Sequence, residues 1–228
     1  MTCCHCDLAD KEFGEKTARR DLARYRKRGP NASTRKLISA IRNHPIAGAK
    51  LMDVGSGIGV LTHELLGGPV ASATLVDESN AYQFVARNLA DERGTRDRCT
   101  FVSGDLVEVQ ASLPEVDLVT LDRVVCCYPD VERLLDSVAN TGASWCGLSY
   151  PKDRWHIRIV VAGINAILWL RRTDFRVFVH PEKRIWQLLV HRGFKVREES
   201  NSFVWKIVLL ERSPKNIGKQ PPANSRHA

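Results

Sequence analysis

The stretch LMDVGSGIGVL occupies residues 51–61, and glycine stands at three alternate positions within it, Gly55, Gly57 and Gly59. The apolar run 49–54 predicts a short buried strand, and the HELL sequence at 63–66 predicts the opening of a helix. Glycine lacks a Cβ, so the backbone can turn tightly here and approach a ligand. The helix N-terminus adds unpaired N–H groups that suit an anionic ligand. The stretch therefore predicts a strand, turn and helix site of the nucleotide-binding class.

Acidic residues follow the next two predicted strands. The strand at 73–76 ends in Asp77, and the strand at 99–102 runs into SGD, which places Asp105 at its tip. A carboxylate at the end of the second parallel strand can accept both hydrogen bonds of a ribose diol, so Asp77 is the candidate for that role. Asp105 is the candidate acceptor for an adenine amino group, although an aspartate in this position is often a helix cap. With Asp53, these residues put three acids at successive strand ends.

The pattern DxGxGxG from Asp53 to Gly59 differs from the dinucleotide fingerprint, which needs glycine where this sequence has Val60. It resembles motif I of class I S-adenosylmethionine (SAM) methyltransferases, and the resemblance covers about residues 33–211. The resemblance implies SAM as the cofactor. The cofactor-binding candidates are Asp53, Gly55, Ser56, Gly57, Gly59, Asp77, Glu78, Gly104, Asp105, Leu106 and Asp122.

Within that superfamily the chain is most similar to magnesium-protoporphyrin O-methyltransferases. The similarity lies in the glycine motif, in the segment that begins at Asp122, and in the apolar helix followed by FRVFVHP. Those enzymes tend to carry a histidine and a tyrosine where this chain has Cys126 and Cys127, so the resemblance assigns no porphyrin substrate.

The order of elements predicts an α/β fold. Further strands are expected at 116–121, 144–149, 194–199 and 203–210, with helices between them. We therefore expect a Rossmann-like, doubly wound, seven-stranded sheet with an antiparallel last strand. The predicted division is a helical lid at 1–32, a methyltransferase domain at 33–212 with a substrate-side insertion at 154–181, and a disordered tail at 213–228.

The N-terminal part predicts an amphipathic helix that stops at Gly29 and Pro30. If this helix covers the cofactor, Tyr25 and its neighbouring arginines are lid residues; otherwise it is a surface helix. The sequence CCHC at 3–6 has soft metal ligands, but adjacent residues cannot easily surround one tetrahedral ion, and no metal is assigned.

The substrate side is expected in two segments. DRVVCCYPD at 122–130 follows the fourth strand, where ligands of such sheets bind, although its cysteines are also typical core residues. The helix at 154–172 is apolar with basic ends, and it suits a pocket wall, a buried core helix or a peripheral membrane contact. The candidates for catalysis are Tyr25, Cys126 and His156. The candidates for substrate binding are Arg123, Tyr128, Arg154, Trp169, Arg176 and His180.

Composition restricts the remaining choices. The 228 residues suffice for one sizeable core, and no run of eighteen apolar residues and no signal peptide is found. The seven cysteines are an odd number, which favours reduced thiols in a cytoplasmic protein. Residues 152–228 carry 16 basic and 6 acidic side chains, a balance that suits nucleic acid, anionic lipid or a carboxylate.

The function predicted from these features is SAM-dependent methylation of a small, largely apolar acceptor, with carboxylate-bearing molecules as one candidate class. An RNA methyltransferase is the first alternative, but the motif of amine methylation, Asn/Asp-Pro-Pro-Tyr, is missing. A regulatory or scaffold protein that binds SAM without catalysis is the second. The missing motif argues against nucleic acid as a partner.

Overall fold

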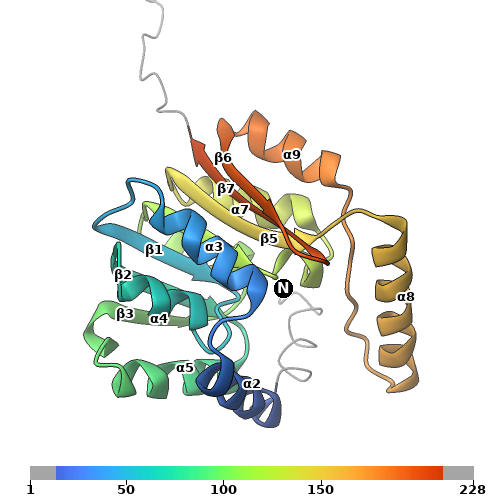
Figure 1. Cartoon of the computed structure of the whole chain (residues 1–228), viewed down its shortest axis with the longest axis horizontal. Coiled ribbons are helices and arrows are strands. Elements are labelled where there is room, and N and C mark those ends of the chain that lie inside the picture. The colour runs from blue at the N-terminus through green and yellow to red at the C-terminus, as the bar shows by residue number, and fades with distance from the viewer. Residues whose placement is uncertain (1–13, 213–228) are drawn as a thin grey trace, which may run out of the picture.

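A computed structural model describes residues 14–212 of the chain (Figure 1). The cluster at residues 3–6 and the tail at 213–228 lie outside the described residues, so the expectations for them stay predictions. Seven strands form one sheet in the order β3-β2-β1-β4-β5-β7-β6. Their bounds are β1 (Ala49–Val54), β2 (Val70–Asp77), β3 (Cys99–Ser103), β4 (Leu118–Asp122), β5 (Trp145–Pro151), β6 (Phe194–Asn201) and β7 (Trp205–Arg212).

The pairing of the strands confirms the predicted sheet. The first five strands pair in parallel, and β7 runs antiparallel to both β5 and β6. The strand order reverses between β1 and β4, and both strands end at the same edge of the sheet. In open α/β sheets, ligands bind beyond the carboxyl ends of the strands at such a reversal.

Helices cover both faces of the sheet. Their bounds are α2 (Glu15–Arg28), α3 (Ala32–Arg42), α4 (Val60–Leu66), α5 (Asn80–Glu92), α6 (Leu106–Val109), α7 (Val131–Asn140), α8 (Trp155–Leu170) and α9 (Glu182–His191). Neighbouring residues of one strand point to opposite faces, so Leu51 packs with α3, α4 and α5, whereas Met52 packs with α6, α7 and α9. The two apolar layers hold the sheet edge in place.

Local sequence signals explain most helix ends. The Asn31 side chain accepts the backbone N–H of Thr34 and caps α3, and Ser79 caps α5 in the same way. Strand β2 begins at Val70, three residues before the predicted start at 73. The prediction missed this part because the small residues 71–72 do not form an apolar run. Helix α9 begins directly after Pro181 and ends two residues before Gly193, which are sequence signals for the start and the end of a helix.

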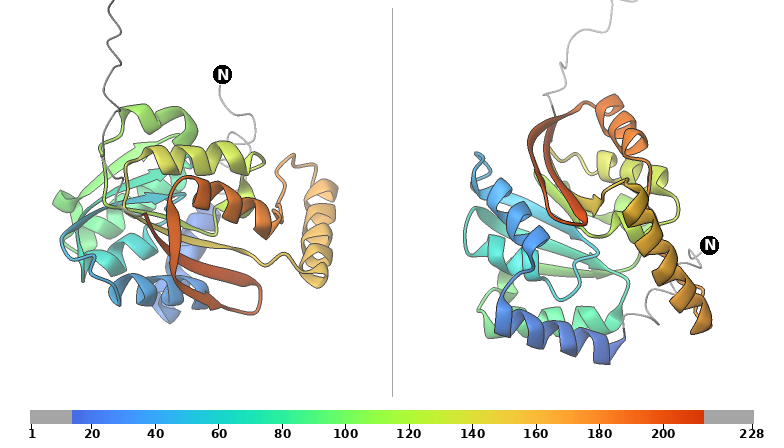
Figure 2. Two further views of the ribbon diagram at one scale, coloured as in Figure 1. Left: turned by 90° about the horizontal axis from the view of Figure 1, so that it is seen from above. Right: turned by 45° about the vertical axis from the view of Figure 1, so that its right-hand side comes forward.

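Two helices lie outside the layers. Helix α2 packs across the glycine turn and α5, through Ala18 and Tyr25. Helix α8 stands apart from the helices that cover the sheet (Figure 2). Only Ile157 and Leu168 of its sixteen residues are buried, so the core-helix interpretation of this segment is wrong.

Candidate functional site

The glycine turn joins β1 to α4 and takes a backbone conformation that side chains resist. Gly55 and Gly57 have φ angles of 58° and 56°, in the left-handed region. A Cβ at Gly55 would lie 2.5 Å from Val124 Cγ2, so the turn packs directly against the segment that follows β4. Glycine at 55 is therefore required by both conformation and space.

Asp77 ties the turn to the neighbouring strand. Its Oδ2 accepts the backbone N–H of Gly57 at 2.7 Å, and its Oδ1 accepts that of Ser79 at 2.9 Å. One carboxylate thus links the tip of β2, the glycine turn and the start of α5. A carboxylate offers about four acceptor positions, so these two bonds are compatible with further donors from a ribose.

Asp53 is buried at the end of β1, next to the turn, and its hydrogen bonds link β1 to α4 and β4. Its two oxygens accept hydrogen bonds from Thr62 Oγ1 at 2.8 Å and from Thr120 Oγ1 at 2.7 Å. Burial raises the pKa of Asp53 to about 7, although the two hydroxyl donors favour the charged form. Both oxygens bond to protein groups, so the geometry favours Asp53 as a support of the turn.

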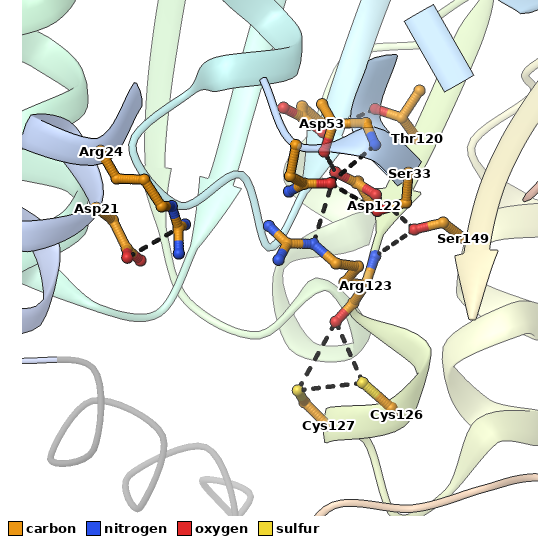
Figure 3. Close-up of polar contacts among 12 residues, drawn as sticks. Asp21, Arg24, Ser33, Asp53, Thr120, Asp122, Arg123, Cys126, Cys127 and Ser149 are labelled. Carbon is orange, nitrogen blue, oxygen red and sulfur yellow. Dashed lines mark hydrogen bonds and ion pairs between the residues drawn. The ribbon is translucent and has the colours of Figure 1, made fainter. Parts of the chain in front are cut away.

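Asp122 and Arg123 form the tip of β4 (Figure 3). The Asp122 carboxylate accepts hydrogen bonds from Thr34 Oγ1 and Ser149 Oγ. Arg123 has a φ of 65°, and its backbone N–H donates to Ser149 Oγ at 2.9 Å. Its Nε is buried 3.9 Å from Asp122 Oδ2, beyond hydrogen-bond distance. The contacts around β4 and β5 therefore fix the backbone of Arg123, and its guanidinium lies beside the Asp122 carboxylate.

A pocket lies between the glycine turn, the tip of β4 and helix α2. From α2 it is lined by Asp21, Arg24 and Tyr25, and Arg123 lines it from the sheet side. Arg24 and Arg123 point toward the same space in Figure 3. Asp21 accepts the Tyr82 hydroxyl at 2.6 Å and pairs with Arg24 at 3.3 Å. The pocket thus presents cations and carboxylates together.

Part of this pocket was missed by the sequence prediction. Asp21, Thr34 and Tyr82 come from three different helices, and no motif marks them. Of these three residues, only Thr34 had a signal in the sequence, because Asn31 three residues before it is a predicted helix cap. The other two could be found only from the packing of α2 on α5.

The three catalytic candidates do not come together. Tyr25 lines the pocket but donates its hydroxyl to Glu64 at 2.6 Å, and burial together with this carboxylate raises the pKa of Tyr25. A phenol in this state is a poor proton acceptor. His156 is exposed on α8, and Cys126 is buried below the backbone of Arg123. Of the three candidates, only Tyr25 lines the pocket.

Asp105 has the helix-cap role that was the alternative for it. Its Oδ1 accepts the backbone N–H of Val107 at 3.0 Å and caps α6, and its Oδ2 accepts the Tyr128 hydroxyl at 2.7 Å. Tyr128 is itself buried, and its hydroxyl makes this hydrogen bond within the protein. An adenine contact at Asp105 would have to share these oxygens.

The other predicted substrate residues fall into two groups. Trp169 is exposed on α8, and Arg154 is exposed directly before the first residue of that helix. Arg176 Nη1 donates to the carbonyl oxygens of Thr173 and Phe175, and His180 Nε2 lies 2.9 Å from the carbonyl oxygen of Tyr128. Of the predicted substrate set, only Arg123 lines the pocket.

Cys126 and Cys127 form a dithiol beside the site, in the 3-10 turn η3 (Val125–Cys127). Their sulfurs lie 3.7 Å apart, and both lie near the carbonyl oxygen of Arg123. The hydrogen bond from Cys126, with the Arg123 charge in support, lowers the pKa of Cys127, and the same bond raises that of Cys126. Cys127 is also the more exposed of the two.

We expect iodoacetamide to alkylate Cys127 before Cys126, because the thiolate is the reactive form. A mass-spectrometric time course on the peptide that contains both residues measures the order, with the buried Cys99 and Cys146 as slow references. Faster labelling of Cys126 than of Cys127 would contradict the assignment.

Residues 52–141 match the family described as methyltransferase domain. The matched span begins in β1 and includes the glycine turn, Asp77 and the tip of β4. The chain carries a SAM-dependent methyltransferase domain. A comparison with curated protein sequences gave no match.

Solved structures share the fold of this methyltransferase domain. One is the magnesium protoporphyrin IX methyltransferase ChlM from Synechocystis PCC 6803 with bound SAH, at 17% identity and a TM-score of 0.70, covering 91% of this chain and 99% of that one. Another is an O-methyltransferase family 2 protein from Planctomyces limnophilus in complex with apigenin, at 17% identity and a TM-score of 0.66. That match covers 87% of this chain and 62% of the other.

Proposed function

We propose that the methyltransferase domain transfers the methyl group of SAM to a small, largely apolar acceptor. The observation that carries this proposal is the segment 173–181, called the strap below, which joins α8 to α9 and runs beside the tip of β4. The Phe178 backbone N–H donates to the carbonyl oxygen of Cys126 at 2.7 Å. Phe175 is buried, and Val177, Phe178 and Val179 follow it after Arg176. An apolar wall thus borders the acceptor side.

The cofactor is proposed to lie along the edge of the sheet, from β2 to β4. Asp77 would accept the ribose hydroxyls. The pocket below α2 would receive the methionine end of SAM, whose ammonium and carboxylate match Asp21 and Arg24. SAM already carries an electrophilic methyl group, so the protein chiefly orients the acceptor and excludes water.

Arg123 is proposed to orient a carboxylate on the acceptor. Its guanidinium stands at the junction of the pocket and the η3 turn, and it is the cation at the tip of β4. A planar guanidinium can bind a carboxylate through two parallel hydrogen bonds. The names of the similar structures, a magnesium protoporphyrin IX methyltransferase and a protein in complex with apigenin, support a small-molecule acceptor.

The test is conversion of SAM to S-adenosylhomocysteine with three sets of acceptors. These are lipophilic carboxylic acids, the corresponding alcohols, and RNA. We expect turnover with the acids and weak, salt-sensitive binding of RNA. Turnover with RNA alone would favour the RNA methyltransferase, and SAM binding without turnover in any set would favour the non-catalytic alternative.

A pair of arginine variants separates the two proposed anion sites. Arg123→Gln is expected to raise the KM for an acidic acceptor about tenfold while leaving the Kd for SAM nearly unchanged, because a charged hydrogen bond is lost only to the acceptor. Arg24→Gln, on the opposite wall, is the matched control and should raise the Kd for SAM. Calorimetry and initial rates measure both, and the reverse pattern would contradict the assignment.

A further inference from the structure

Helix α8 exposes an unusual amount of apolar surface. Within residues 14–212, eleven large apolar side chains are exposed, and seven of them lie on this helix. These seven are Trp155, Ile159, Val160, Ile164, Ile167, Trp169 and Leu170. A monomeric protein in water seldom gathers so many on one element without a partner for them.

The charged side chains of α8 and its two ends are all basic, although Arg158 pairs with Asp153, just before the helix, at 2.7 Å. Residues 154–172 contain four arginines and no acidic residue. The arginines stand toward the two ends, at 154 and 158 and at 171 and 172, and an exposed tryptophan accompanies each end. Tryptophan favours the headgroup region of a membrane, and arginine near the surface is attracted to anionic lipid.

The length of α8 excludes a crossing of the bilayer. Sixteen helical residues extend about 24 Å, which is shorter than the hydrocarbon core of about 30 Å. Within the part of the chain that the structure describes, no helix is both long and apolar enough to span a membrane. A contact of α8 with lipid would therefore place the helix along the surface.

The strap connects this surface to the proposed site. Asn165 of α8 binds the backbone of Val177 through two hydrogen bonds, of 2.8 and 2.9 Å, and the next residue of the strap binds Cys126. Helix α8 is thus attached through Asn165 to the segment that follows β4, while its seven apolar side chains remain exposed. Figures 1 and 2 show the helix at the periphery of the fold.

We propose that α8 docks flat on an anionic lipid bilayer and that the acceptor enters the site from that bilayer. Entry of the acceptor from the bilayer rests on the proposed function, whereas docking of α8 does not. A second copy of the chain is a poorer occupant, because pairing two such faces would bring arginines of like charge together. Anionic headgroups instead complement both ends of the helix.

Flotation with phosphatidylcholine vesicles, with and without phosphatidylglycerol, tests the docking. The unaltered chain should bind the anionic vesicles, and Ile159→Ser combined with Trp169→Ser should weaken that binding about tenfold or more. Arg154→Gln combined with Arg172→Asn should weaken it about fivefold per charge, and only when phosphatidylglycerol is present. Val190→Ser removes an exposed apolar side chain from α9 and should leave binding unchanged.

Several results would overturn the docking proposal. These are a lack of binding by the unaltered chain, equal binding to neutral vesicles, or unchanged binding by both pairs of variants. Sedimentation equilibrium without vesicles that showed a dimer lost in the serine variants would assign the face to a second copy.

SAM affinity and turnover of a dispersed acceptor, measured on every variant, separate this proposal from the proposed function. Intact turnover without vesicle binding rejects the membrane contact alone. Vesicle binding without turnover on any acceptor rejects the proposed function alone. If turnover is intact but vesicles that contain the acceptor do not raise its rate, entry from the bilayer is rejected.

Discussion

Replacing Asp77 by Ala is expected to weaken SAM binding by about 2–4 kcal/mol, or roughly 30- to 1,000-fold. The proposed ribose acceptor would be lost, and so would the bonds that hold the N–H groups of Gly57 and Ser79. Titration calorimetry measures the change. Asp77→Asn keeps one carbonyl acceptor, so its SAM affinity should lie between that of the unaltered chain and that of Asp77→Ala.

The control for this experiment is Asp136→Ala, which removes an exposed carboxylate that pairs with Arg192 on the far helices. Its SAM affinity should equal that of the unaltered chain. Equal affinity in the Asp77 variants would show that the strand-tip acid does not hold the cofactor.

Replacing Asp53 by Asn is expected to stabilise the fold increasingly as the pH rises. The folded pKa of Asp53 is about 7, above the usual value of 3.8, so the folded state retains a proton that the unfolded chain has released. Its contribution is full below pH 3.8 and declines as the pH rises to about 7, by about 4 kcal/mol at most. Asparagine avoids this decline while keeping the shape of the side chain.

The measurement is the difference in unfolding free energy between the variant and the unaltered chain, from urea titrations between pH 4 and pH 8. A difference is needed because His63 acts in the opposite direction. Burial lowers the pKa of His63 to about 4, so its contribution is present above pH 6.5 and declines as the pH falls toward 4. A difference that stayed constant with pH would contradict the proposed ionisation of Asp53.

The fold could be predicted because its signals are local. The alternation of strands and helices is visible in apolar runs that end in Asp77 and Asp122, in glycines at the ends of elements, and in the helix at 182–191. The structure confirms the resulting sheet. The glycine turn and the tip of β4 were also located, because motif spacing identifies them.

The contacts of the candidate site could be predicted only in part. Tyr25 lines the pocket beside the turn, but its bond to Glu64 joins residues 39 positions apart, and no local pattern reports such a contact. The same holds for Tyr128 and Asp105, whose side chains bind each other. The composition of α8 left its position open, because an apolar helix of sixteen residues suits a core as well as an exposed face.

The 2.5 Å separation between Val124 and the position of a Cβ on Gly55 has a consequence for evolution. The cofactor turn and the segment that borders the acceptor share one tightly filled space, so neither sequence can drift alone. A descendant that acquired a new acceptor by rebuilding residues 122–130 would still inherit a constraint on the size of the side chain at 124. Diversification of this chain is therefore easier in α8, most of whose side chains are exposed.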